Sequence, residues 1–313
     1  MKIIITGGSG YTGTLLTSEL LSLGHKVMII DTQWFGNIFK SGKNLIVKKA
    51  DIRNLEGISF KGYDCVIHLA NIANDPSVEL SPNLSWDVNV LATKNLIEKS
   101  INDKIKQVIY ASSGSVYGVK KEKNVTEELK LVPISVYNKT KMIAERIILS
   151  YGNKIKSHII RPATVCGYSP IMRLDVTVNM FVHQAIKNKL ITIFGGQQIR
   201  PNIHINDLID VYKHFLFKPS LPSGFYNAGF ENISLIDIAK KISSITSCKI
   251  KIKKEIDVRS YKQNSDKLIS TGFKPKKGVE DAIYELKSYF LNSNVKNIDK
   301  CYRVNRMKKL GLK

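Results

Sequence analysis

Long apolar runs, closely spaced cysteines and recognisable nucleic-acid-binding motifs are missing from this sequence of 313 residues. No apolar run approaches the roughly 20 residues that a membrane-spanning helix requires, so we expect no membrane span. The four cysteines lie far apart and include no CxxC pair: Cys65, Cys166, Cys248 and Cys301. This spacing predicts neither a disulfide framework nor a metal site, but buried or unreactive thiols.

Acidic residues are scarce, since 26 Asp and Glu stand against 48 Lys and Arg for a net charge of +22. The lysines are scattered along the chain, which is typical of a solvated surface and predicts no nucleic-acid partner. The exception is the basic tail at 293–313, where the sequence favours a frayed terminus over a weak anion-binding surface. Residues 1–8 pass directly into a glycine-rich turn and leave no room for a signal peptide, so we expect a cytoplasmic protein.

The N-terminus contains the first informative pattern. An apolar run at 2–6 leads into a turn with Gly7, Gly10 and Gly13, and leucines at helical spacing follow. A strand, a glycine turn and a helix in this order predict a loop that binds a pyrophosphate through backbone N–H groups. The next predicted strand, 26–30, ends in Asp31, whose carboxylate suits an adenosine ribose diol and repels a 2′-phosphate. The pattern favours NAD over NADP; the alternative is a structural turn capped by an acid.

Strands and helices then alternate, with strands near 45–47, 65–69 and 107–110 and a helix at about 85–101. This rhythm predicts an α/β fold, a Rossmann-type doubly wound parallel sheet that binds ligands at the carboxyl ends of its strands. Beyond Arg161 the rhythm weakens, which indicates a smaller C-terminal α/β substrate domain. We predict an NAD-binding domain at 1–165 with a return segment at about 203–217, a substrate domain at 166–202 and 218–292, and a tail at 293–313.

Tyr137 and Lys141 stand four residues apart at the predicted start of a helix, and therefore on one helical face. An ammonium group near a phenol favours the phenolate, so Lys141 is expected to lower the pKa of Tyr137 and make it a proton acceptor. The alternative is a solvated surface pair. Ser113 follows the strand at 107–110 and is expected at the same edge of the sheet.

Together these motifs resemble an extended short-chain dehydrogenase/reductase of the NAD-dependent epimerase/dehydratase family. The resemblance extends from Met1 to about Leu286. Besides the glycine loop and the tyrosine–lysine pair, it rests on Asp31, Asp51, His68-Leu69-Ala70, Asn89-Val90 with Thr93, residues 112–118, Arg161-Pro162, residues 200–204 and residues 226–229.

The resemblance implies that Ser113, Tyr137 and Lys141 form a catalytic triad that oxidises the C4 hydroxyl of a GDP- or UDP-linked sugar with NAD. It implies these cofactor contacts in addition to Tyr137 and Lys141: Gly7, Gly10, Tyr11, Thr12, Gly13, Asp31, Asp51, Ile52, Leu69 and Ala70. The substrate contacts that it implies are Ser113, Asn179, Arg200 and Arg259. It also implies a homodimer or larger homo-oligomer that pairs through the helices at 85–101 and 134–150.

Departures from the family pattern reduce the number of reactions that we expect. Gly114 and Ser115 stand where nucleotide-sugar dehydratases carry an Asp-Glu pair, so dehydration is not expected. Two activities stay open. One is a 4-epimerase, which is slightly favoured, and the other is a 4-dehydrogenase of the GDP-heptose or GDP-mannose type. Either enzyme would act in the biosynthesis of nucleotide sugars for surface glycans. Cys166 replaces the family's usual tyrosine, and residues 33–37 and 169–175 are expected to shape substrate choice. A non-catalytic NAD-binding sensor is disfavoured because all three triad residues are present.

Overall fold

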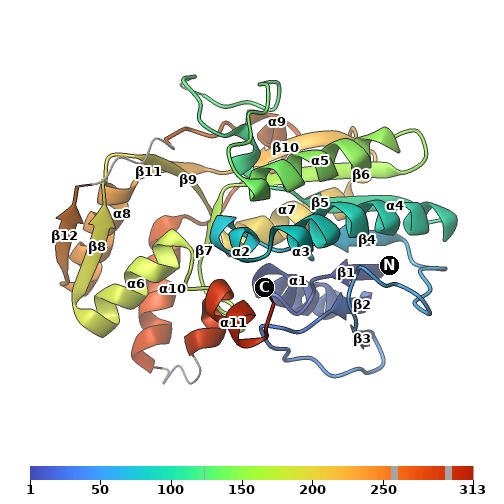
Figure 1. The fold of residues 1–313 in the computed structure, drawn as a ribbon, viewed down its shortest axis with the longest axis horizontal. Coiled ribbons are helices and arrows are strands. Elements are labelled where there is room, and N and C mark those ends of the chain that lie inside the picture. Colours follow the sequence, from blue (N-terminus) through green and yellow to red (C-terminus); the bar gives the residue numbers. More distant parts are fainter. Residues whose placement is uncertain (123, 255–259, 293–297, 313) are drawn as a thin grey trace.

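A seven-stranded sheet forms the larger of two lobes in the computed structural model, which describes residues 1–122, 124–254, 260–292 and 298–312 (Figure 1). All neighbouring strands pair in parallel. The order is β10-β6-β5-β4-β1-β2-β3, with β1 (Lys2–Thr6), β2 (Lys26–Asp31), β3 (Leu45–Lys49), β4 (Cys65–His68), β5 (Gln107–Ala111), β6 (Lys156–Pro162) and β10 (Gly224–Ala228). The predicted doubly wound sheet is confirmed, and its order reverses between β1 and β4, where such folds bind ligands.

Helices cover both faces of this sheet because its central strands are apolar on both sides, as in buried β4. One face packs against α1 (Tyr11–Ser22), α7 (Ile205–Phe217) and α9 (Asp266–Ser270). The other face carries α2 (Asp75–Leu80), α3 (Pro82–Trp86), a π-helical turn (Asp87–Leu91), α4 (Ala92–Asn102) and α5 (Val136–Ser150). The helices predicted at 85–101 and 134–150 are therefore present, and their pairing with a second copy stays a prediction.

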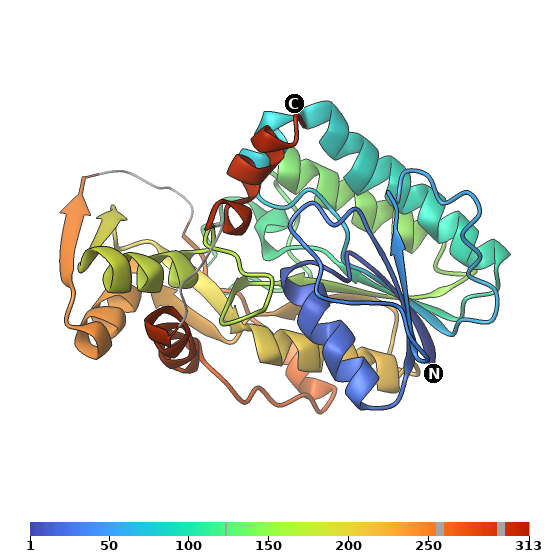
Figure 2. The same cartoon turned by 90° about the horizontal axis from the view of Figure 1, so that it is seen from below.

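The smaller lobe lies beside the carboxyl ends of the strands (Figure 2). It contains a three-stranded sheet of β7 (Thr164–Cys166), β9 (Ile199–His204) and β11 (Glu231–Ser234), and a parallel pair of β8 (Leu190–Phe194) and β12 (Lys249–Lys253). Three helices pack around one apolar core: α6 (Thr177–Asn188), α8 (Leu235–Thr246) and α10 (Val279–Asn292). The predicted boundary needs one correction, because β10 pairs with β6 in the large sheet although it falls within 218–292.

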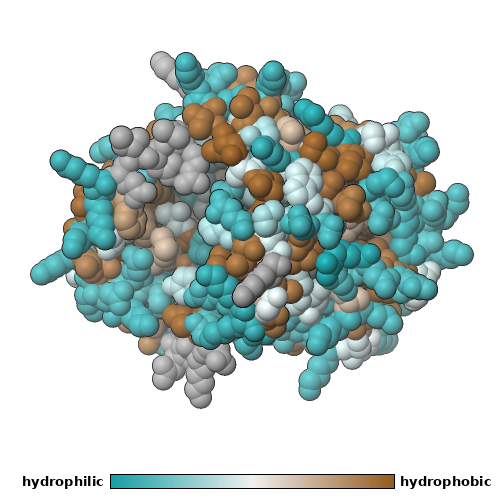
Figure 3. All heavy atoms as spheres, viewed as in Figure 1, coloured by the Kyte–Doolittle hydropathy of each residue, from teal (hydrophilic) through white to brown (hydrophobic). Residues whose placement is uncertain are grey.

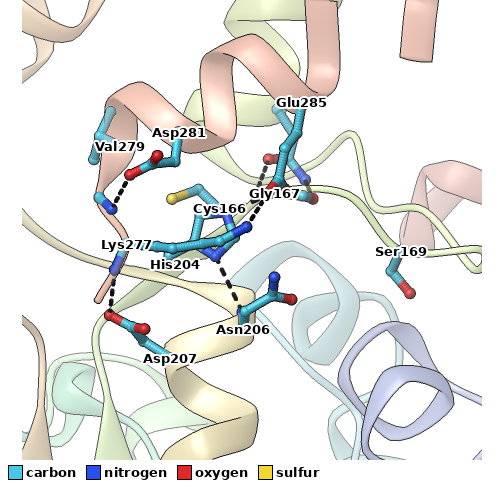
Figure 4. A network of polar contacts seen from close by, with 12 residues as sticks. Cys166, Gly167, Ser169, His204, Asn206, Asp207, Lys277, Val279, Asp281 and Glu285 are labelled. Atoms are coloured by element: carbon cyan, nitrogen blue, oxygen red, sulfur yellow. Dashed lines mark hydrogen bonds and ion pairs between the residues drawn. The ribbon is translucent and has the colours of Figure 1, made fainter. Parts of the chain in front are cut away.

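A polar network joins the two lobes where β9 leads into α7 (Figure 4). His204 is buried, and its Nδ1 accepts the Asn206 N–H at 3.1 Å, so its Nε2 carries the proton and donates to Glu285 of α10 at 3.2 Å. The Lys277 ammonium binds the other Glu285 oxygen at 2.6 Å. Cys166 lies next to this network with a buried thiol, so the residue that replaces the family's tyrosine belongs to the packing at the junction.

The part of the C-terminal tail that the structure describes, residues 298–312, is folded, which corrects the expectation from its charge. Within 298–312 a 3-10 turn (Ile298–Cys301) and α11 (Arg303–Lys309) pack between the lobes, because Cys301 enters the apolar core of the smaller lobe and Met307 that of the larger. Its apolar residues, which charge counting ignores, anchor it. Residues 293–297 lie outside the described part of the chain.

Hydrophilic side chains project along most of the outline in Figure 3, as the dispersed lysines predict. All four cysteines are buried and free of disulfides, as expected. Among the described residues, none of the helices is both long and apolar enough to cross a bilayer.

Candidate active site

A cavity of about 640 Å³ opens at the carboxyl ends of the central strands, between the two lobes. It is lined by most of the predicted site residues: Gly7, Gly10, Tyr11, Thr12, Gly13, Asp31, Asp51, Ile52, Leu69, Ala70, Ser113, Tyr137 and Arg200. The turns after β1, β2, β4 and β5 therefore meet in one space, as the parallel topology requires.

The glycine loop packs too tightly for side chains. A Cβ on Gly13 would lie 2.1 Å from the Gly7 carbonyl oxygen, and one on Gly7, whose φ is +74°, would lie 2.7 Å from the Ala70 nitrogen. Helix α1 begins after Gly10 without a side-chain cap, so its first N–H groups are available to an anion. This open helix terminus fits the pyrophosphate of a dinucleotide cofactor.

Two carboxylates lie at the far end of this loop. Asp31 accepts the Ser9 N–H at 3.0 Å and the Gln33 N–H at 2.6 Å, and burial raises its pKa. Asp51 binds the Arg53 guanidinium at 2.8 Å; burial raises its pKa, but the bonds to Arg53 outweigh that and hold it below its usual range. Asp31 thus has a fixed orientation toward the cavity, as an acceptor for a ribose diol needs.

The predicted triad lies at the other end. Ser135 caps α5 by accepting the Asn138 N–H, which places Tyr137 in the first helical turn. The Ser113 hydroxyl hydrogen-bonds the Ser115 hydroxyl at 2.8 Å, and it is close enough to the Tyr137 phenol to lower the pKa of that group. Lys141, one turn further along α5, is 1% exposed and does not line the cavity in this structure.

The pKa of Tyr137 is set differently from the sequence prediction. Burial prevails and raises it to about 12, and the opposing influences are the Ser113 hydroxyl and the Arg173 charge, not Lys141. The Lys141 ammonium instead donates to the Ala111 carbonyl at 2.7 Å, and burial lowers its own pKa to about 7. Its effect on the phenol must therefore depend on a rotation or on a bound cofactor.

A buried network supports the strand end that carries Ser113. The Ser112 hydroxyl donates to Glu145 at 2.5 Å, and Glu145 pairs with Arg161 at 2.8 Å, both side chains being almost fully buried. Arg161 also donates to the Tyr117 hydroxyl at 2.8 Å. Such a fully satisfied network fixes the backbone around the serine. The Arg161-Pro162 motif thus has a positioning role.

Of the predicted substrate residues, Ser113 and Arg200 line the cavity together. Asn179 does not: its carbonyl accepts the Gly167 N–H at 3.0 Å, and its amide donates to the Tyr11 hydroxyl at 3.1 Å. Because this amide is fully engaged, Asn179 joins the smaller lobe to the glycine loop and does not offer its side chain to a ligand here. Arg259 lies outside the described residues.

The side chains that line the cavity and that were not predicted as site residues include Arg173, Arg303 and Tyr261. Arg173 binds Asp175 at 2.9 Å and acts electrostatically on Tyr137. Arg173 lies in the 169–175 segment, whose unusual sequence was the signal that could have identified it as a site residue. Arg303 belongs to the tail and had no signal beyond its charge.

Comparisons with known proteins place this geometry in context. The family model described as "NAD dependent epimerase/dehydratase family" matches residues 3–229. An uncharacterized UDP-glucose epimerase of Bacillus subtilis, YtcB, is 31% identical over 80% of this chain and 83% of its own length. UDP-glucose 4-epimerase 4 of Oryza sativa is 28% identical over 79% of this chain and 77% of its own. The Thermus thermophilus UDP-glucose 4-epimerase complex with NAD has the same fold, with a TM-score of 0.82, 22% identity and coverage of 94% of this chain and 100% of that one.

Proposed function

Because this chain belongs to the NAD-dependent epimerase/dehydratase family, we propose that it oxidises the C4 hydroxyl of a nucleoside-diphosphate sugar and returns the hydride to the opposite face, as a 4-epimerase. The observation that carries the proposal is that the Ser113 and Tyr137 side chains line the same cavity as the glycine loop, with the Ser113 hydroxyl close enough to act on the Tyr137 phenol. A hydroxyl-bearing substrate held there would be near both an oxygen-binding group and a proton acceptor.

Different residues of this chain would bind the substrate and transfer its proton. Tyr137 takes the proton of the sugar hydroxyl, and Ser113 hydrogen-bonds the same oxygen and keeps it in line. NAD, when bound, would supply the hydride acceptor. The Lys141 ammonium is needed near the phenol because burial outweighs the influence of Ser113 and Arg173 and leaves the pKa of Tyr137 at about 12, too high for a base at neutral pH. Arg200 and Arg173 line the cavity and suit the substrate's phosphates.

The surroundings of Gly114 argue against dehydration. A Cβ at Gly114 would lie 2.7 Å from the Gln263 Oε1 and 3.3 Å from the Tyr261 hydroxyl. The Gln263 side chain is itself held by a 2.7 Å bond to the Arg161 carbonyl. An aspartate, as the dehydratase pattern has at this position, would have to displace the Gln263 and Tyr261 side chains, which disfavours the acid that expels water.

The test follows both the cofactor and the sugar. Purified protein is incubated with UDP-glucose, UDP-galactose and GDP-mannose that carry deuterium at C4, while absorbance at the NADH band and product NMR are recorded together. We expect one of these substrates to invert at C4, to keep its deuterium and to leave no lasting NADH. Tyr137→Phe is the matched control and should give no product with any of them.

Other products would overturn the proposal in a defined way. Stoichiometric NADH with a released 4-keto sugar would make the protein a 4-dehydrogenase, and a 4-keto-6-deoxy product would make it a dehydratase. NAD binding without turnover of any nucleotide sugar, including heptose derivatives, would indicate a non-catalytic NAD-binding protein.

A further inference from the structure

The C-terminal segment 298–312 connects the two lobes next to the cofactor half of the cavity. The Cys301 carbonyl accepts the Leu174 N–H at 2.9 Å, and Arg306 donates to the Trp34 carbonyl at 2.6 Å. Met307 is 1% exposed in the core of the larger lobe. Both views show α11 beside α2 (Figures 1 and 2). Because it is anchored on both sides, the segment holds a side chain at the cavity in a fixed place.

That side chain is Arg303. It is 5% exposed, lines the cavity, and lies over the Phe35 ring with its guanidinium carbon 3.9 Å from the ring centre. Its contacts to the described residues include one hydrogen bond, to the Lys300 carbonyl, at the outer limit of 3.5 Å. A guanidinium has five N–H donors, and buried charges of this kind are normally paired. Burial and the charge of Arg173 lower the pKa of Arg303 to about 9.

The nearby carboxylates do not satisfy it. Asp175 is paired with Arg173 at 2.9 Å, and Asp31 accepts two backbone N–H groups. Both act on Arg303 electrostatically without an ion pair among the described residues. The donors of Arg303 that face the cavity are therefore available to an anionic ligand.

The contacts of the segment place Arg303 along the cofactor site. Its guanidinium lies over Phe35, shortly after Asp31 at the predicted adenosine ribose end, whereas Cys301 binds Leu174, the neighbour of Arg173, toward the other end. A position between the two ends is where the diphosphate of a dinucleotide must pass. We propose that Arg303 binds the diphosphate of NAD and that the C-terminal segment is thereby part of the cofactor site. A planar guanidinium fork suits two phosphate oxygens.

Ligand binding to Arg303→Gln tests this without reference to turnover. Calorimetric affinities are measured for NAD and ADP-ribose, which contain the diphosphate, and for adenosine, which lacks it. We expect the variant to bind NAD and ADP-ribose about 10- to 100-fold more weakly, and adenosine within about twofold of the unchanged protein. Release of bound NADH, followed by fluorescence, should accelerate by a similar factor.

Two further variants keep the result interpretable. Lys308→Gln removes the same charge from an exposed position on the same helix and should leave all three affinities unchanged. Arg303→Lys keeps the positive charge but lacks the planar guanidinium fork, so it should show an intermediate loss of affinity for NAD and ADP-ribose. It replaces the glutamine variant in the test if that variant fails to fold. The proposal fails if ADP-ribose binds the Arg303 variants as tightly as the unchanged protein. It also fails if adenosine loses as much affinity as ADP-ribose, because Arg303 would then only support the shape of the adenosine end.

Discussion

The two halves of the cavity are built by different means. The cofactor half consists mainly of backbone at the ends of adjacent parallel strands, where Gly7 follows β1, Gly13 lies in the first turn of α1 and Asp31 ends β2. The substrate half is assembled from side chains of separate segments, such as Arg173, Arg200 and Tyr261. The difference teaches that a site made by strand order can be identified from local patterns, whereas one made by long-range packing is visible only after folding.

The largest expected effect falls where the halves meet. Tyr137→Phe removes the proton acceptor but fills the same space, so turnover should fall by about 10²–10⁴-fold while NAD affinity stays within about twofold. Initial rates and cofactor titration measure the two quantities. Tyr226→Phe is the matched control, because its hydroxyl binds the Pro222 carbonyl away from the cavity. Comparable activity of the two variants would remove Tyr137 from its role.

The cofactor half should be intolerant of a single methyl group. Gly13→Ala forces a Cβ against the Gly7 carbonyl, a backbone atom that cannot rotate away. We expect a loss of about 1–3 kcal/mol in the free energy of unfolding, together with weaker NAD binding. Gly42→Ala is the control, since a Cβ there meets no atom within 4 Å. Equal stability of the two variants in urea would show that the loop can widen.

The preference for NAD over NADP tests the role of the Asp31 carboxylate at the end of β2. Asp31→Asn keeps the shape of the side chain but removes the charge that repels a 2′-phosphate, so the ratio of NADP to NAD affinity should rise by roughly tenfold. Titration of the cofactor-free protein with both dinucleotides gives this ratio. An unchanged ratio would mean that another group excludes NADP. The melting temperature without cofactor serves as the control, because Asp31 also accepts two backbone N–H groups.

The smallest expected effect lies at the lobe junction. Burial opposes ionisation of Glu285, but its bonds to His204 and Lys277 prevail and lower its pKa from 4.5 to about 2. The folded state therefore binds the proton less readily than the unfolded chain. The stability from this carboxylate is complete above pH 4.5 and is lost as the pH falls toward 2.

Glu285→Gln should accordingly cost about 1 kcal/mol at pH 7, because the side chain is partly exposed. Urea unfolding at pH 7 and at pH 3 measures whether the difference from the unchanged protein shrinks in acid. Glu280→Gln is the control, since its pair with Lys241 lies on the surface. A constant difference at both pH values would show that the network acts through packing alone.

The fold and much of the cofactor half could be predicted because their signals are local. A glycine turn between a strand and a helix, or an acid at a strand end, needs only a few consecutive residues, and parallel topology then brings the strand ends together. The same reasoning placed Ser113 and Tyr137 in the cavity. It missed the orientation of Lys141, because an i,i+4 spacing defines a helical face but not which acceptor the ammonium selects.

The sequence by itself determined the doubly wound sheet, the glycine loop, the carboxylate of Asp31 and the glycine at 114, since each depends on backbone periodicity or on the size of one side chain. Only the tertiary structure decided that β10 joins the large sheet, that Asn179 holds Tyr11 and that Arg303 reaches the cavity. These depend on contacts between residues far apart in the chain. Such contacts are selected by the free energy of burying apolar and polar groups together, and no short stretch of sequence encodes that free energy.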